Sequence, residues 1–138
     1  PEPRLFHVLH TCWHCENPPC VAACPSGALT KRPEDGIVVI DADVCTHCGL
    51  CESACPYGAI VDTPEGGRKC DFCVDLLAAG REPACVEACP MGVLTCGPLA
   101  ELPGIAPEGH GLPPASLTRP SLRMVPHHHW SSCNHGEV

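Results

Sequence analysis

The sequence is poor in aromatic residues and in positive charge. Among 138 residues there are two Phe, two Trp and one Tyr, and 8 Lys and Arg stand against 16 Asp and Glu, for a formal net charge of -8. So few aromatic residues, together with 17 Pro and 13 Gly, leave little material for an ordinary side-chain core. The acidic balance, with no basic face, argues against nucleic acid as a partner.

Long apolar runs are lacking as well, and cysteine is abundant. No stretch of about 18 apolar residues is present, so the sequence predicts no direct membrane span. The 14 cysteines alone would suit a secreted disulfide scaffold. Their spacing favours metal or cluster ligands instead, because pairs are separated by two intervening residues and Cys24, Cys55 and Cys89 each precede a proline.

The most specific signal is the run C-T-H-C-G-L-C-E-S-A-C-P, which begins at Cys45. Its spacing, C-x2-C-x2-C-x3-C followed by proline, is the bacterial ferredoxin pattern for 4Fe-4S clusters. Cys51 and Cys55 are four residues apart on a predicted helical turn, so Cys55 lies further along the same face and addresses a second cluster. Pro56 then ends the helix.

A variant of this run precedes it, and a third group follows. Cys12 opens the variant C-x2-C-x4-C-x3-C, and Cys70 opens C-x2-C-x11-C-x3-C, whose insert predicts a helix over Val74 to Ala79 closed by Gly80. A strand is predicted over Leu5 to Thr11. Between the first two runs, residues 26–32 and 37–41 predict a hairpin around the turn Pro33 to Gly36.

One phrase recurs three times along the chain. C-P-S-G-A-L-T begins at Cys24, C-P-Y-G-A-I-V at Cys55 and C-P-M-G-V-L-T at Cys89. The repeat predicts units of a cysteine loop, a helical turn and a strand, each too small to bury its own apolar face. We therefore expect an α+β fold, a ferredoxin-like two-cluster 4Fe-4S domain with a pseudo-twofold repeat. The apolar shell is predicted to comprise Val21, Ala22, Leu29, Val38, Ile40, Leu50, Ala54 and Ile60.

The predicted organisation has three parts. Residues 1–66 form the two-cluster ferredoxin-type domain, residues 67–97 a third, incomplete ferredoxin-type unit, and residues 98–138 an extended Pro-rich tail lying on the domain or on a partner. Nothing in the sequence pairs a nucleophile with a base, so we expect an electron-transfer protein and not an enzyme.

The three cysteine groups, in this order, resemble a known family. C-W-H-C-E-N-P-P-C-V-A-A-C-P, C-T-H-C-G-L-C-E-S-A-C-P and C-D-F-C-V-D-L-L-A-A-G-R-E-P-A-C-V-E-A-C-P are similar to the iron-sulfur (beta) subunits of dimethyl sulfoxide reductase, formate dehydrogenase and polysulfide reductase. The tail phrase Leu117 to Pro120 leans toward the dimethyl sulfoxide reductase branch. The resemblance implies electron relay between a membrane quinol-linked anchor subunit and a molybdopterin catalytic subunit, through up to four 4Fe-4S clusters.

The resemblance also implies the ligand sets. Cluster one would be held by Cys12, Cys15, Cys20 and Cys55, and cluster two by Cys45, Cys48, Cys51 and Cys24. The family carries a further N-terminal cysteine run that this sequence does not contain, so we expect an N-terminally truncated chain. Cys70, Cys73 and Cys85 would then form an incomplete third site, and Cys89 would serve the cluster of the missing run.

Other interpretations stay open. The protein could be a free-standing soluble polyferredoxin or, less in keeping with its cysteine triplets, a structural zinc-binding module. Cys96 is expected to be a small buried hydrophobe. Cys133 with the histidines of the C-terminal tract is expected to bind metal only adventitiously. His14 and His47 are expected to tune clusters without ligating iron, and Trp13 is expected to limit the access of water.

The resemblance favours membrane association through partner subunits on the extracytoplasmic face, with the cytoplasmic face as the alternative.

Overall fold

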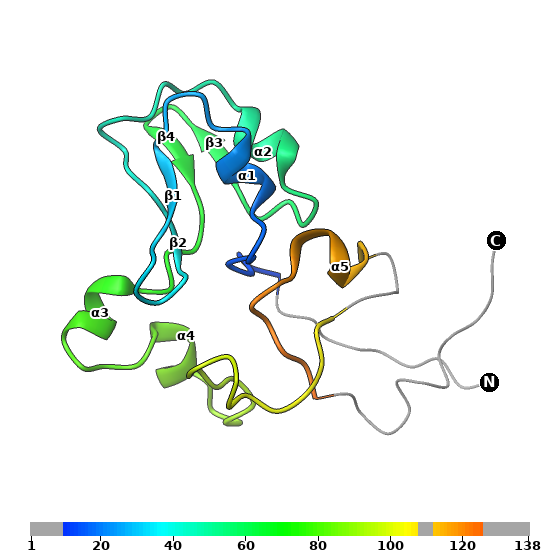
Figure 1. Cartoon of the computed structure of the whole chain (residues 1–138). Coiled ribbons are helices and arrows are strands. Elements are labelled where there is room, and N and C mark those ends of the chain that lie inside the picture. Colours follow the sequence, from blue (N-terminus) through cyan, green and yellow to red (C-terminus); the bar gives the residue numbers. More distant parts are fainter. Residues whose placement is uncertain (1–9, 108–111, 126–138) are drawn as a thin grey trace, which may run out of the picture.

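The computed structural model describes residues 10–107 and 112–125, in which short helices and two small hairpins are joined by long loops (Figure 1). The α+β class predicted from the sequence agrees with this structure. The elements are, in chain order, α1 (Pro19–Ala22), β1 (Leu29–Lys31), β2 (Val38–Ile40), α2 (Leu50–Ala54), β3 (Val61–Thr63), β4 (Gly66–Arg68), α3 (Val74–Ala78), α4 (Ala84–Glu87) and α5 (Ala115–Thr118).

The two hairpins follow the first and second cysteine runs. β1 pairs with β2 in antiparallel register, with Leu29 opposite Ile40, and this confirms the predicted hairpin. Its turn is held by the Ile37 amide, which donates to Asp35 Oδ1 at 3.0 Å. β3 pairs with β4 in the same way, with Val61 opposite Arg68. The repeated phrase thus leads into a hairpin in its first two copies.

Each cysteine group also contains a short helix just before its last cysteine. α1 precedes Cys24, α2 precedes Cys55 and α4 precedes Cys89. Pro19 is the first residue of α1, where its fixed φ suits the helix and its missing N–H costs nothing. The insert helix of the third group, α3, ends before Gly80 with φ +72°. Since glycine adopts this left-handed conformation freely, the predicted helix end is confirmed.

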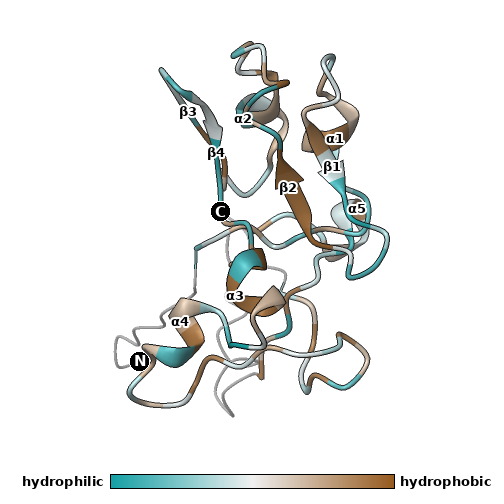
Figure 2. Cartoon of the chain, turned by 90° about the vertical axis from the view of Figure 1, so that its left-hand side faces the viewer, coloured by the Kyte–Doolittle hydropathy of each residue, from teal (hydrophilic) through white to brown (hydrophobic). Residues whose placement is uncertain are grey.

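The core is small and lies between the first two cysteine runs. Leu29, Val38, Ile60 and Cys20 form one buried cluster, and strand β2 stands out as its apolar strand (Figure 2). Part of the predicted shell was wrong: Leu50 is 50% exposed and Ala22 is exposed as well. Both residues lie on helices of one turn, which pack with one side only and leave the other in water.

The third copy of the repeat departs from the first two. Val93 to Gly97 was predicted as a strand phrase, yet no strand is present there in the described residues, and Cys96 is only half-buried. The first two copies are each paired with a return strand of their hairpin. A proline stands nine residues after the cysteine in all three copies, at Pro33, Pro64 and Pro98, so proline does not explain the difference. Val93 is 70% exposed, so the third copy has no buried face against which a strand could pack.

The tail returns to the body of the molecule. Ile105 and Met124 form an isolated antiparallel bridge, and α5 lies beside the first cysteine loop (Figure 1). The segment is therefore not simply extended, as the sequence had predicted. The expected strand over Leu5 to Thr11 and the His-rich tract with Cys133 lie outside the described residues, apart from His10 and Thr11. The division at residues 66 and 97, and the pseudo-twofold, stay predictions.

Candidate iron-sulfur sites

Each C-x2-C pair is closed by the same backbone turn. The residue just before the second cysteine has a left-handed backbone in all three groups: φ is 41° at His14, 55° at His47 and 61° at Phe72. This conformation is uncommon for residues other than glycine and costs free energy. Its recurrence indicates that the loop geometry around each cysteine pair, and not local preference, decides the conformation.

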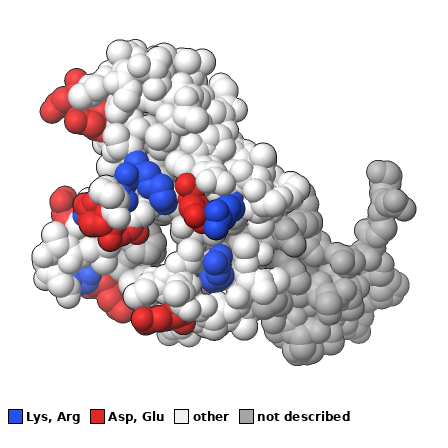
Figure 3. Space-filling view, in the orientation of Figure 1, with Lys and Arg blue, Asp and Glu red and all other residues white. Residues whose placement is uncertain are grey.

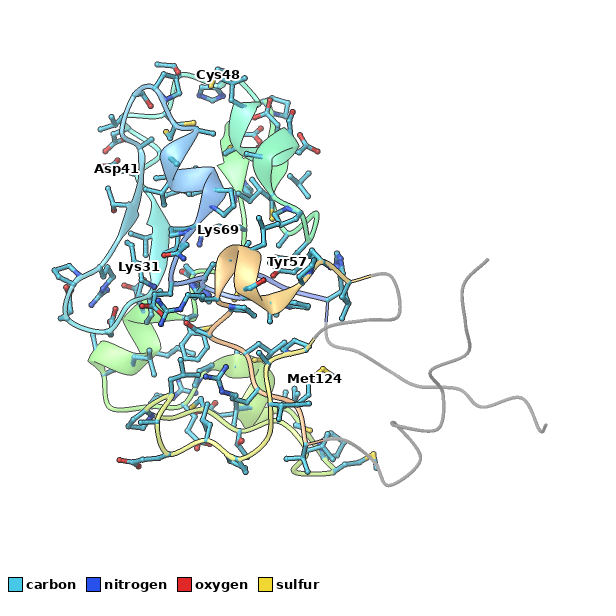
Figure 4. All side chains as sticks on the ribbon, turned by 45° about the vertical axis from the view of Figure 1, so that its right-hand side comes forward. Lys31, Asp41, Cys48, Tyr57, Lys69 and Met124 are labelled. Carbon is cyan, nitrogen blue, oxygen red and sulfur yellow. The ribbon has the colours of Figure 1, made fainter. Side chains whose placement is uncertain are left out.

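Four cysteines from two different runs surround one open cavity, which we call the second cavity. It encloses about 360 Å³ of non-atom space, its open mouth included. Cys24, from the end of the first run, lines it together with Cys45, Cys48 and Cys51. Gly67 of β4 forms part of the opposite wall, where a Cβ atom would lie 3.6 Å from Cys51 Sγ. Cys48 is exposed at the outer tip of the molecule (Figure 4).

Another four cysteines, again three from one run and one from the other, surround a cavity that we call the first cavity. It has about 340 Å³ of non-atom space, its open mouth included. Cys55, from the end of the second run, lines it together with Cys12, Cys15 and Cys20. Trp13 is only 3% exposed, as expected for a residue that limits water access, and its ring packs on that of Tyr57 with centroids 4.0 Å apart. Tyr57 lies beside α5 (Figure 4). The first cavity is therefore the better covered of the two.

The repeated Cys-Pro-x-Gly phrase surrounds its own cysteine with hydrogen-bond donors. Burial alone would raise the pKa of the Cys24 thiol, but hydrogen bonds from the Leu29 amide, the Ser26 hydroxyl and the Ala28 amide outweigh it and lower the pKa. Backbone hydrogen bonds likewise lower the pKa of Cys89, led by those from Leu94 and Val93. Both sulfurs are thus prepared to carry the negative charge that an iron ligand needs.

Burial dominates at the first cavity. It raises the pKa of the Cys20 thiol to about 11, with the neighbouring Cys12 and Cys55 acting in the same direction. The pKa of His14 is lowered to about 4 by burial and by Lys69 and Lys31. His14 Nδ1 accepts the Val38 amide at 3.0 Å, so the neutral ring carries its proton on Nε2.

Two lysines connect the cysteine loops to the rest of the fold. Lys31 Nζ donates to the carbonyls of Cys15 at 3.0 Å and Gly36 at 2.6 Å. Lys69 Nζ donates to the carbonyls of Val38 and Cys70. On the face drawn in Figure 3, Lys and Arg gather between the upper and lower parts of the molecule, and acidic groups lie mostly toward its edges. Lys31 and Lys69 thus link backbone segments from different parts of the fold by hydrogen bonds.

The third cysteine group does not join either cavity. Neither is lined by Cys70, Cys73, Cys85 or Cys89. Cys85 is exposed. Burial raises the pKa of the Cys96 thiol, and the nearby Glu82 and Cys85 act in the same direction. Cys70 influences the pKa of Cys12 in the same manner, though less than burial does. The third group therefore adjoins the first cavity without contributing to its wall.

The two cavities fit 4Fe-4S clusters better than single metal ions. Each is lined by four cysteines, with mostly apolar neighbours at the first cavity and both apolar and polar ones at the second. Trp13 Nε1 and His14 Nε2 are buried N–H groups without a hydrogen-bond partner in the structure. Trp13 lines the first cavity, where cluster sulfur could accept a hydrogen bond from it. Within residues 10–107 and 112–125, no three His, Cys, Asp or Glu side chains converge as ligands of one ion.

Comparison with known proteins identifies the family. A family model described as "4Fe-4S dicluster domain" matches residues 4–99. The protein belongs to this family. Its cofactors are accordingly 4Fe-4S clusters, as the cysteine spacing had predicted.

Curated relatives extend the match into the tail. The sequence is 44% identical to one chain of the anaerobic dimethyl sulfoxide reductase of Escherichia coli K12, over 88% of this protein and 61% of the relative. It is 37% identical to a subunit of the sulfite dehydrogenase of Allochromatium vinosum (91% and 58%) and 48% identical to the thiosulfate reductase electron transfer subunit PhsB of Salmonella typhi (68% and 50%). The resemblance to iron-sulfur beta subunits is thereby confirmed.

The chain spans about three fifths of the length of the first of these relatives. In the part of the chain that the structure describes, no helix is long and apolar enough to cross a membrane.

Two residues near the first cavity escaped sequence analysis: Tyr57, which lines it, and Thr118, which contacts it from the tail. Only the oddity of a Tyr within a Cys-Pro-x-Gly phrase could have drawn attention to the first. Thr118 lies within the tail phrase Leu117 to Pro120, which resembles the family, but nothing in that phrase indicated a contact with the first cavity.

Proposed function

We propose that this protein transfers electrons through two 4Fe-4S clusters, held by Cys12, Cys15, Cys20 and Cys55 in the first cavity and by Cys45, Cys48, Cys51 and Cys24 in the second. The observation that supports this most is the exchange of fourth cysteines between the two runs, so that each cavity is lined by three cysteines of one run and one of the other. When bound, each cluster would take up and release one electron. The protein's part is to exclude water, donate hydrogen bonds to sulfur and hold the clusters at a fixed separation.

The third group is proposed as an incomplete site. Cys70, Cys73 and Cys85 would supply three ligands, with Cys89 directed elsewhere. Its open position and the exposure of Cys85 support a cluster that is lost easily from this protein.

The partners proposed are a molybdopterin catalytic subunit and an integral membrane anchor linked to quinol, on the extracytoplasmic face of a membrane. Relatives that are each named as one component of a reductase or a dehydrogenase, one of them as an electron transfer subunit, support a complex of several subunits. The molybdopterin group, the anchor and the membrane face rest on the family resemblance of the sequence. Catalysis would then belong to the partner subunit, and this protein would connect it to the anchor.

Anaerobic reconstitution of the protein tests the cofactor proposal. Two clusters correspond to about eight firmly bound iron atoms, a brown protein and bleaching on reduction with dithionite. A colourless protein that binds zinc instead would overturn the proposal. The role in a complex is tested by sequencing the flanking genes for a molybdopterin oxidoreductase, and then by co-purification with that protein and reoxidation of the reduced clusters by it and its substrate.

A further inference from the structure

The tail is fastened along the first cysteine loop. The amides of Glu16 and Asn17 donate to the carbonyls of Arg119 and Thr118, both at 2.9 Å, and the Ser121 amide donates to the Trp13 carbonyl at 2.9 Å. Ser121 Oγ donates to the His14 carbonyl at 2.8 Å. An ion pair joins Arg119 to Glu16 at 3.0 Å, although both side chains are more than half exposed, so it adds little. Residues 118–121 thus form a fixed outer layer over this loop.

This fastening buries one hydroxyl completely. Thr118 is 0% exposed, and its Oγ1 forms a short hydrogen bond with the Tyr57 hydroxyl. Burial raises the pKa of the Cys15 thiol, and the Thr118 hydroxyl lies near enough to its sulfur to offset part of that effect. The surroundings are apolar, since Trp13, Leu112 and Leu122 pack around Cys15 and Tyr57. A hydrogen bond is electrostatically stronger in such a place than in water.

Counting protons gives the direction of the hydrogen bond between Tyr57 and Thr118, and of a hydrogen bond between Thr118 and the Cys15 sulfur. A hydroxyl has one proton to donate and two lone pairs. The thiolate of Cys15, as an iron ligand, can only accept, so the Thr118 proton points to sulfur. Thr118 Oγ1 therefore accepts from Tyr57. The result is a directed series of two hydroxyls, Tyr57 to Thr118 to Cys15.

The second cavity has a hydroxyl contact of a different origin. Ser26 Oγ lies 3.6 Å from Cys24 Sγ, only two residues away in sequence. That contact comes with the local turn, whereas the Thr118 contact exists only because the tail has folded back. The described residues that line the second cavity include no Phe, Trp or Tyr, and Cys48 is open to solvent.

We propose that Thr118, held in place by Tyr57, sets the reduction potential of the cluster in the first cavity by donating a hydrogen bond to the Cys15 ligand. The inference rests on the proposed function, since it concerns one of the two clusters. Reduction adds negative charge to the cluster and its thiolates, and a donor to sulfur stabilises the more negative state. Thr118 thus raises the potential of this cluster, and Tyr57 is a positioning residue.

The test is a redox titration of the reconstituted full-length protein, followed by electron paramagnetic resonance. Thr118→Val keeps the shape of the side chain and removes the hydroxyl, so the first cluster should shift to a more negative potential while the second does not move. Thr118→Ser keeps the hydroxyl and lacks the methyl group, so the first cluster should have the wild-type potential in this variant. If the methyl group mattered and the hydroxyl did not, the Ser variant would shift instead. Thr30→Val, on an exposed position of β1, should change neither potential, and Ser26→Ala should leave the first cluster unchanged.

An unchanged potential of the first cluster in a fully loaded Thr118→Val protein would overturn the proposal, as would a Ser variant that shifts as far as the Val variant. Should Thr118→Val lose its first cluster, Tyr57→Phe decides, because it removes only the group that orients Thr118. A smaller shift in the same direction is then expected, and no shift refutes the relay. Failure of the proposed function looks different, since wild-type protein would then show no reducible clusters at all.

Discussion

At the scale of single residues, the fourth cysteine of each unit differs from the other three. It follows a one-turn helix and begins a turn whose glycine is left-handed: φ is 70° at Gly27, 57° at Gly58 and 60° at Gly92. A Cβ atom at any of these glycines would meet nothing within 4 Å, so it is the backbone conformation that requires glycine there. The turn brings amides toward sulfur at Cys24 and Cys89.

The exchange of fourth cysteines gives a prediction for Cys55. Because Cys55 lines the first cavity with Cys12, Cys15 and Cys20, Cys55→Ser should damage the first cluster and spare the second. Electron paramagnetic resonance of the reduced variant should show one 4Fe-4S signal, with about four iron atoms retained. Cys24→Ser is the matched variant, since Cys24 lines the other cavity. Loss of the second cluster in Cys55→Ser would contradict the exchange.

Sequence reasoning found the residues whose role is local and missed those that meet through the fold. The cysteines that line the two cavities stand in runs whose spacing had marked them as candidate ligands, and their role as ligands stays a prediction. Trp13, predicted as a cover, is buried. Tyr57 and Thr118 are 61 residues apart in sequence, and neither is part of a periodic pattern, so no local rule predicts their contact. The exposure of Leu50 escaped prediction because a helix of one turn has no periodicity to read.

At the scale of elements, the hairpins form one wall of each cavity. Glycine in that wall decides how closely the backbone can approach the cysteine sulfurs. Gly67 of β4 lines the second cavity and has no strained φ, and its Cβ would be in ordinary contact with Cys51 Sγ and with Ile40 at 3.6 Å. A small residue is therefore tolerated at this position, whereas a larger one enters the space of the cluster.

We expect Gly67→Ala to load both clusters and Gly67→Val to lose or weaken the second. The extra methyl groups of valine overpack the wall, which typically costs about 1–3 kcal/mol. Iron content and the spectrum of the reduced protein measure this directly. Equal loading of the second cluster in the two variants would show that β4 lies further from it than the structure indicates.

The tail bridge gives a second prediction at this scale. Gly104 has φ +95°, and a Cβ atom there would overlap the carbonyl of Met124. Gly104→Ala should therefore break the bridge between Ile105 and Met124, at a cost of more than about 1 kcal/mol. Amide hydrogen exchange at those two residues should accelerate. Gly97→Ala is the control, because its Cβ would only touch Leu102 at 3.8 Å; equal acceleration in both variants would refute the explanation.

At the scale of the whole molecule, two matching cysteine runs end in unequal surroundings. The first cavity is covered by Trp13, Tyr57 and, behind them, the tail. The second opens at Cys48 near the outer tip (Figure 4). Solvent exposure is one of the factors that set cluster potentials, so two clusters of the same type are expected to differ.

This asymmetry predicts the order of cluster loss. In a chelator or on brief exposure to air, the second cluster should be lost several-fold faster than the first, because water and oxidant reach Cys48 directly. Any cluster at Cys70, Cys73 and Cys85 should be lost before both, which leaves about eight iron atoms after mild treatment. Time-resolved iron release with electron paramagnetic resonance distinguishes the sites. Release at one common rate would refute the difference in protection.

The attachment of the tail also bears on how the protein is made. Residues emerge from the ribosome in order, and Ser121 contacts Trp13 and His14 across more than a hundred positions. All four cysteines of the first cavity have been synthesised by Cys55, well before the segment that covers them. During that interval the first cysteine loop is present without the segment that covers it, so the tail can close over the loop only after all four cysteines of the first cavity have been made.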